Sequence, residues 1–121
     1  MTIESPEQFV NNLWDWGILD GCFGESKIKP TDVDGLVERN GHFLILEAKS
    51  PTAEVKQGQE ITFQHAIQAK SMTVFVVWGE PGKPERLRMI SKWKDQEVDA
   101  DIEKFREKVS QWYEWANRNG V

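Results

Sequence analysis

Apolar and polar positions along the chain follow two periods, one typical of helices and one typical of strands. Ser5 and Pro6 suit the start of a helix, and the apolar residues that follow at helical spacing end near Gly17. Helical spacing returns at Gln59–Lys70 and again at Asp99–Asn117. We therefore expect a helix near each end of the chain and one in its middle.

The segment between the first two helices has the pattern of a β-hairpin. Thr31–Glu38 and His42–Ser50 are strand-like runs, and the Asn40-Gly41 pair between them favours a tight turn, because both residues tolerate a positive φ. The run Phe43–Leu46 is apolar at consecutive positions. This predicts a central strand that is covered on both faces.

Strand patterns continue after the middle helix. Thr73–Trp78 is apolar and rich in β-branched residues, Gly79–Pro84 reads as a turn, and Arg86–Ile90 reads as a short edge strand. The elements follow each other in the order α-β-β-α-β, with a further helix at the C-terminal end. This order predicts a single α/β domain over residues 1–121, with a central mixed sheet flanked by helices.

Composition and charge narrow the class of protein. The chain has 121 residues, a formal net charge of −5 and one cysteine, Cys22, so an internal disulfide is excluded. No apolar run approaches the length of a membrane span, and we expect a cytoplasmic protein without a membrane partner. Net acidity argues against nucleic-acid binding through bulk charge, although it leaves room for a local basic surface.

Charged residues gather at one end of the predicted hairpin. The two-residue turn places Asp34 opposite Glu47 and Asp32 opposite Lys49, and residues two apart on a strand share a face. Like charges that face each other across a sheet destabilise it. A Mg²⁺ or Mn²⁺ ion held between Asp34 and Glu47 removes this conflict, and Lys49 then lies where it can stabilise charge on a phosphate.

The motif Pro30–Gly35, with its aspartates, followed by Leu44–Lys49, with Glu-Ala-Lys at its end, resembles the PD-(D/E)XK nuclease superfamily. The resemblance covers about residues 5–78 and is greatest to small phage and bacterial members, including Holliday-junction resolvases and the VRR-NUC group. It implies a restriction-endonuclease-like core and a metal-dependent nuclease that hydrolyses DNA, including branched DNA.

The resemblance also implies a set of metal ligands. These are the carboxylates of Asp34 and Glu47 and the backbone carbonyl of Ala48. The chain departs from the family pattern because Val33, and not proline, precedes Asp34. Asp32 therefore stays open as a second or alternative ligand.

Three further roles follow from the resemblance. Lys49 would act on the attacking water, Gln59 would support the site from the start of the middle helix, and Glu7 would be an additional ligand from the first helix, with Glu4 the weaker choice.

Two other interpretations remain open at this stage. The charged residues can form a structural ion-pair cluster, or the domain can be a non-catalytic nuclease-like module that binds DNA or a protein partner. Tyr113 and Trp115 lie off the main apolar stripe of the last helix and are candidates for a homodimer contact.

Overall fold

The computed structural model describes residues 14–121. The chain divides into two compact units, Met1–Asp32 and Val33–Val121. In the described part of the first unit, a short 3₁₀ helix, η1, spans Trp16–Leu19. Most of the helix expected from Ser5 onward lies outside the described residues. Gly17, where that helix was expected to end, lies inside η1.

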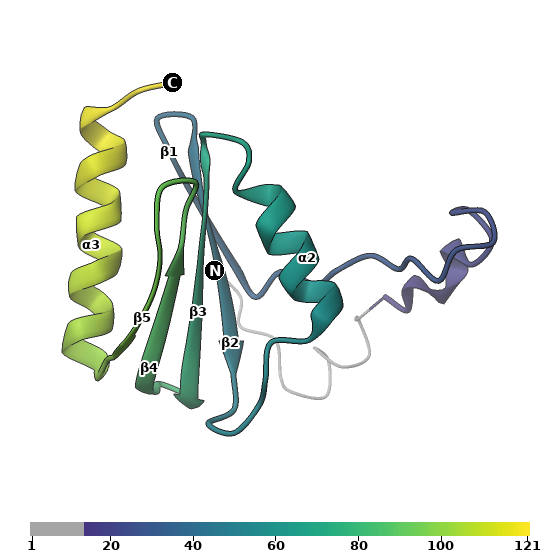
Figure 1. Cartoon of the computed structure of the whole chain (residues 1–121), viewed down its shortest axis with the longest axis horizontal. Helices are drawn as coiled ribbons and strands as arrows, with labels where there is room; N and C mark the ends of the chain where they lie inside the picture. The colour runs from purple at the N-terminus through teal and green to yellow at the C-terminus, as the bar shows by residue number, and fades with distance from the viewer. Residues whose placement is uncertain (1–13) are drawn as a thin grey trace, which may run out of the picture. The chain divides into compact units, whose positions relative to one another are not determined.

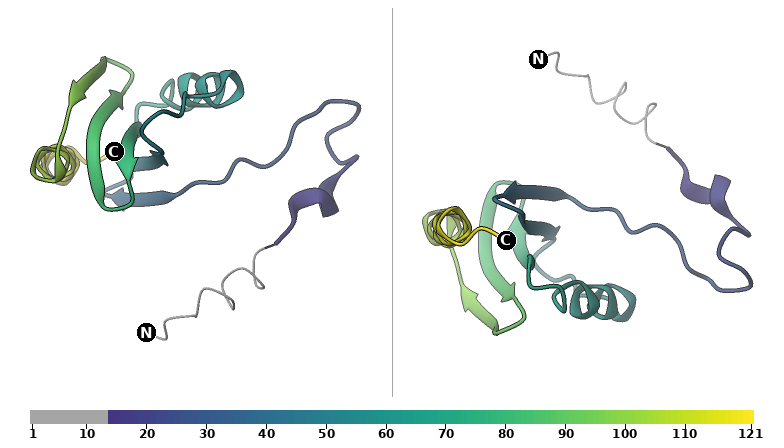
Figure 2. Two further views of the ribbon diagram at one scale, coloured as in Figure 1. Left: turned by 90° about the horizontal axis from the view of Figure 1, so that it is seen from below. Right: turned by 90° about the horizontal axis from the view of Figure 1, so that it is seen from above.

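The second unit is a five-stranded mixed sheet with a helix on each face (Figures 1 and 2). Its elements are β1 (Gly35–Arg39), β2 (His42–Lys49), α2 (Gln57–Ala66), β3 (Met72–Glu80), β4 (Lys83–Ile90), β5 (Asp95–Asp99) and α3 (Ile102–Arg118). The strands lie side by side in chain order; β2 and β3 are parallel, and every other neighbouring pair is antiparallel. The α/β class with a mixed sheet is confirmed.

The β1–β2 hairpin has the register that the Asn40-Gly41 turn predicts. Asn40 has φ 59° and Gly41 has φ 86°, and Gly35 pairs with Leu46 at the far end of the ladder. The first strand, however, begins at Gly35 and not at Thr31. The ladder ends here because the backbone amide of Ala48 donates to the side chain of Asp34, at 2.9 Å.

Each helix covers one face of the sheet because side chains alternate between the two faces along every strand. Phe63 of α2 and Ile67, the residue that caps its C-terminal end, pack in a buried cluster whose strand members are Val74, Val76, Trp78 and Ile90. Trp112 and Ala116 of α3 pack on the other face, in a buried cluster with Leu44, Phe75, Leu87 and Ala100. Strand β2 is therefore an inner strand that is covered on both faces, next to the central strand β3.

Further predictions about the elements were wrong. β4 is an inner strand and not an edge, because β5, which the pattern did not predict, pairs with its free side. Gly79 belongs to β3, and a Cβ at this position would lie 2.2 Å from the backbone oxygen of Lys83. The middle helix ends at Ala66, short of the predicted Lys70. Within the described residues, no helix is both long and apolar enough to cross a membrane.

Candidate metal centre

Asp34 lies directly before β1, beside the end of β2. Its Oδ2 accepts a hydrogen bond from the backbone amide of Ala48, which holds the exposed carboxylate against the neighbouring strand. The hairpin register continues through Gly35 opposite Leu46, so the next pair along the ladder would be Asp34 and Glu47. The register that the Asn40-Gly41 turn sets thus places Asp34 beside β2, the strand that bears Glu47.

Glu47 is the most enclosed carboxylate of this region. It is 8% exposed, and in the sheet it stands next to Val76 of β3, on the face that α2 covers. The side-chain Nε2 of Gln59 donates to Glu47 Oε1 at 3.2 Å, and Lys49 Nζ lies 3.9 Å from the same oxygen. A buried carboxylate needs such partners, because burial without them costs several kcal/mol.

Gln59 is held at both ends of its side-chain amide. Its Oε1 accepts from the backbone amide of Lys56, which caps the first turn of α2, while its Nε2 reaches Glu47. The two bonds couple the start of α2 to β2, the second strand of the hairpin. Any group that binds at Glu47 therefore meets a Gln59 amide that is already oriented.

Lys49 completes the group from the same strand. It stands two residues after Glu47 and so projects from the same face, and its side chain is only 10% exposed. A largely buried ammonium beside a carboxylate can stabilise an anion that approaches the pair, because solvent screens its charge weakly.

A second charged cluster, which the sequence patterns did not identify, fastens α2 to the sheet. Arg88 of β4 donates two hydrogen bonds to Glu60, both 2.8 Å long, and two more to Asp95 of β5, at 2.7 and 2.9 Å. These bonds lower the pKa values of the Glu60 and Asp95 carboxyls and raise the pKa of the Arg88 guanidinium. Since Glu60 follows Gln59 directly, the cluster also positions the helix turn that reaches Glu47.

Only one feature of the sequence indicated that Arg88 would bind carboxylates in the fold. Arg86 and Arg88 alternate with apolar residues, which places both on the face of β4 that α2 covers. A cation on a covered face calls for a partner, but nothing local in the sequence says which carboxylate supplies it.

The donor set suits a hard divalent cation. Mg²⁺ is commonly bound by one or two carboxylates and keeps the rest of its coordination for water and substrate phosphate, so Asp34, Glu47 and a backbone carbonyl are sufficient. Among the described residues, no group of three or more His, Cys, Asp or Glu side chains could hold a metal by itself. A cation bound at Asp34 and Glu47 would therefore keep coordination positions open to water or substrate.

Three other acidic residues were expected near this site. Asp32 is exposed and belongs to the first unit, while Glu7 and Glu4 lie outside the described residues. Their roles as ligands stay predictions.

The proposed dimer contact on α3 is only partly exposed. Trp115 is half-buried and packs within its own unit, with ring centroids 4.3 Å from His42 and 6.2 Å from Trp93. Tyr113 is 46% exposed, beneath the guanidinium of Arg39. The geometry accounts for Trp115 without a second chain, and a homodimer stays a prediction. Comparison of the chain with protein-family models, with curated proteins and with solved structures found no match.

Proposed function

We propose that this protein is a Mg²⁺- or Mn²⁺-dependent nuclease that hydrolyses phosphodiester bonds in DNA. One observation supports this proposal most. Lys49 and Gln59 both approach the same carboxylate oxygen of Glu47, and Asp34 accepts a hydrogen bond from the next backbone amide, that of Ala48. A structural ion pair needs only the lysine and one carboxylate. It gives no reason for a second carboxylate, Asp34, on the backbone amide next to Glu47.

Each residue of the site has a distinct role in this proposal. Asp34, Glu47 and the backbone carbonyl of Ala48 would hold the cation, which when bound polarises a phosphate and lowers the pKa of a bound water. Lys49 orients the attacking water and stabilises negative charge that develops on the phosphate oxygens. Gln59 keeps the Glu47 carboxylate in one orientation, so that less reorganisation is needed during the reaction.

The order of elements around the site also supports the proposal. The β1–β2 hairpin carries the acidic residues, α2 follows, and β3 returns parallel to β2. We propose that this part of the sheet is a restriction-endonuclease-like core, with β4, β5 and α3 added on its far side.

A cleavage panel tests the activity directly. Purified protein is incubated with linear, nicked, single-stranded and branched DNA, and with RNA, in Mg²⁺, in Mn²⁺ and in chelator. We expect metal-dependent hydrolysis of at least one DNA substrate, with loss of activity in Glu47→Gln. Binding of DNA without cleavage under all of these conditions would instead support a non-catalytic module.

Substitution of Lys49 tests its role in the reaction. Lys49→Ala should retain metal binding but lose at least about 100-fold in cleavage rate, because removing one group that stabilises transition-state charge costs about that much. Lys104→Ala, an exposed position on α3, is the matched control and should cleave at the wild-type rate. A Lys49→Ala protein as active as the control would overturn the role assigned to Lys49.

A further inference from the structure

A cavity of about 310 Å³ lies on the opposite face of the sheet from Glu47, between α3 and the β4–β5 hairpin. Phe75 and Met89 from the sheet and Trp112 from α3 form its inner wall, and Trp93 and Trp115 line it as well. Its volume is at the lower end of the range for small-molecule sites. None of Asp34, Glu47, Lys49 and Gln59 lines it.

The aromatic residues of the cavity are arranged as a stacking site. Trp93, in the turn between β4 and β5, is 66% exposed, although its ring lies 6.2 Å from that of Trp115 in an edge-on arrangement. The buried indole Nε1 of Trp112, in the cavity wall, has no hydrogen-bond partner among the described residues. A turn that holds a tryptophan largely in solvent beside two others provides an open aromatic surface for a planar ring.

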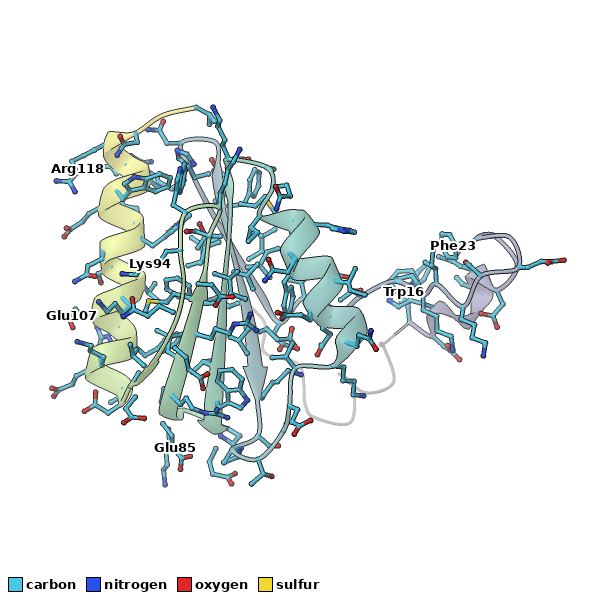
Figure 3. The ribbon with its side chains drawn as sticks, in the orientation of Figure 1. Trp16, Phe23, Glu85, Lys94, Glu107 and Arg118 are labelled. Atoms are coloured by element: carbon cyan, nitrogen blue, oxygen red, sulfur yellow. The ribbon has the colours of Figure 1, made fainter. Side chains whose placement is uncertain are left out.

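The charges around the cavity have a single sign. Lys94 and Lys108 are the charged residues that line it, and no carboxylate does, in a protein with a net charge of −5. Figure 3 shows Lys94 next to α3, the helix that carries Lys108. Within the described chain neither lysine forms an ion pair, and Lys108 contacts only the side-chain oxygen of Gln111, at 3.4 Å. The cavity is thus complementary to an anion, unlike the protein as a whole.

We propose that this cavity binds a planar aromatic ligand that carries a negatively charged group. The ring stacks on the exposed face of Trp93, with its edge toward Trp115, and the anionic group faces Lys94 and Lys108. A nucleoside monophosphate and an aromatic carboxylate share this chemistry. The site lies on the other face of the sheet from the proposed nuclease centre, and its occupancy does not depend on catalysis there.

Binding is measured by isothermal titration calorimetry and by shifts of the tryptophan indole N–H signals in NMR spectra. The probes are adenosine 5′-monophosphate and indole-3-carboxylate, with adenosine, indole and inorganic phosphate as the counterparts that lack either the charge or the ring. We expect saturable binding of at least one anionic aromatic probe, at least about 10-fold tighter than its neutral counterpart and than phosphate. Tighter binding of the monophosphate identifies a nucleotide site, and tighter binding of the carboxylate identifies an aromatic-acid site.

Variants test whether binding occurs in this cavity. Trp93→Ala should lower the affinity for the bound probe by about 5- to 100-fold, the range for loss of one stacking contact. Lys94→Ala should lower the affinity for the anionic probe but not for its neutral counterpart. Lys104→Ala, on the same helix as Lys108 but outside the cavity, should bind as the wild type does. Glu47→Gln should also bind normally, which separates this site from the metal centre.

Three results would overturn the proposal. These are the absence of saturable binding of both anionic probes to the folded protein at millimolar concentration, equal affinity for charged and neutral rings, and a Trp93→Ala protein that binds as tightly as Lys104→Ala.

Discussion

The side-chain amide of Gln59 contacts two elements at once, the capping backbone of α2 at Lys56 and the carboxylate of Glu47 on β2. Gln59 is uncharged, so it can orient the Glu47 carboxylate but adds no charge to the site. Its contribution should therefore appear in the rate and in metal affinity more than in the stability of the fold.

If Glu47 is a metal ligand, Gln59→Ala should lower cleavage by about 10- to 100-fold, the usual scale for a group that orients a ligand. The half-saturating Mg²⁺ concentration should rise as well. The matched control is Gln57→Ala, which removes an exposed glutamine two residues before Gln59 in the first turn of α2. Steady-state cleavage at varied Mg²⁺ makes the measurement. Equal rates for the two variants would leave Gln59 with a role in helix capping alone.

Asp34 allows charge and hydrogen bonding to be separated at one position. Asp34→Asn keeps an oxygen that can accept from the Ala48 amide but removes a negative charge beside Glu47. In chelator this variant should match the wild type or gain up to about 1 kcal/mol, the scale of a cross-strand charge pair. Added Mg²⁺ or Mn²⁺ should reverse the order, since metal at ten times its Kd stabilises the wild type by about 1.4 kcal/mol.

Melting curves of both proteins, in chelator and in metal, test this reversal. Asp34→Ala is the companion variant, because it removes the acceptor as well and should lose about 1 kcal/mol in chelator. If metal raises the melting temperatures of Asp34→Asn and the wild type equally, Asp34 does not hold the cation.

At the scale of elements, Arg88 ties α2 and β5 to the same strand. Its bonds lower the pKa values of Glu60 and Asp95 in the folded protein from ordinary values of 4.5 and 3.8. A carboxyl with a lowered folded pKa stabilises the fold at a pH above its ordinary value, and this contribution is lost as the pH falls through the folded pKa. The cluster should therefore stabilise the protein at neutral pH and stop doing so in acid.

Arg88→Gln should cost on the order of 1–2 kcal/mol at pH 7, because the charge-assisted bonds are strong but Glu60 and Asp95 are partly exposed. The difference from the wild type should shrink as the pH falls below about 4.5 and through the lowered folded pKa values of the two carboxyls. Urea unfolding at several pH values measures it. A difference that stays constant between pH 7 and pH 3 would mean that packing of the Arg88 side chain, and not its charge, stabilises the fold.

For the whole molecule, the buried core belongs to one unit. Every buried hydrophobic residue of the described chain lies within Val33–Val121, whereas Trp14, Ile18 and Ile28 of the first unit are each more than 60% exposed. Both sides of the sheet are covered by helices of the same unit. The second unit thus has what a cooperative domain requires.

A protein that consists of residues 33–121 should accordingly fold alone. We expect one cooperative thermal transition within about 5 °C of that of the full chain, because a two-state domain keeps its transition when its own core is intact. Circular dichroism melting, with the near-ultraviolet tryptophan signal as a second probe, measures this. Non-coincident transitions of the two probes, or loss of the near-ultraviolet signal, would show that Met1–Asp32 contributes to the core.

The sequence alone determined the features that depend on local geometry. The Asn40-Gly41 turn sets the hairpin register, and the two-residue period of a strand then places Glu47 and Lys49 on one face with Asp34 next in line. Apolar runs likewise marked β2 and β3 as inner strands. These features follow from a few neighbouring residues, so no long-range contact is needed to predict them.

Only the tertiary structure decided the features that join distant segments. β5 has one apolar residue, Val98, and is a strand because β4 offers it an unpaired edge. Arg88 meets Glu60 through the packing of α2 on the sheet, and it meets Asp95 through the pairing of β4 with β5. The aromatic cavity forms where α3 meets the β4–β5 turn. Such contacts depend on how separate elements pack, and no local pattern of residues encodes that.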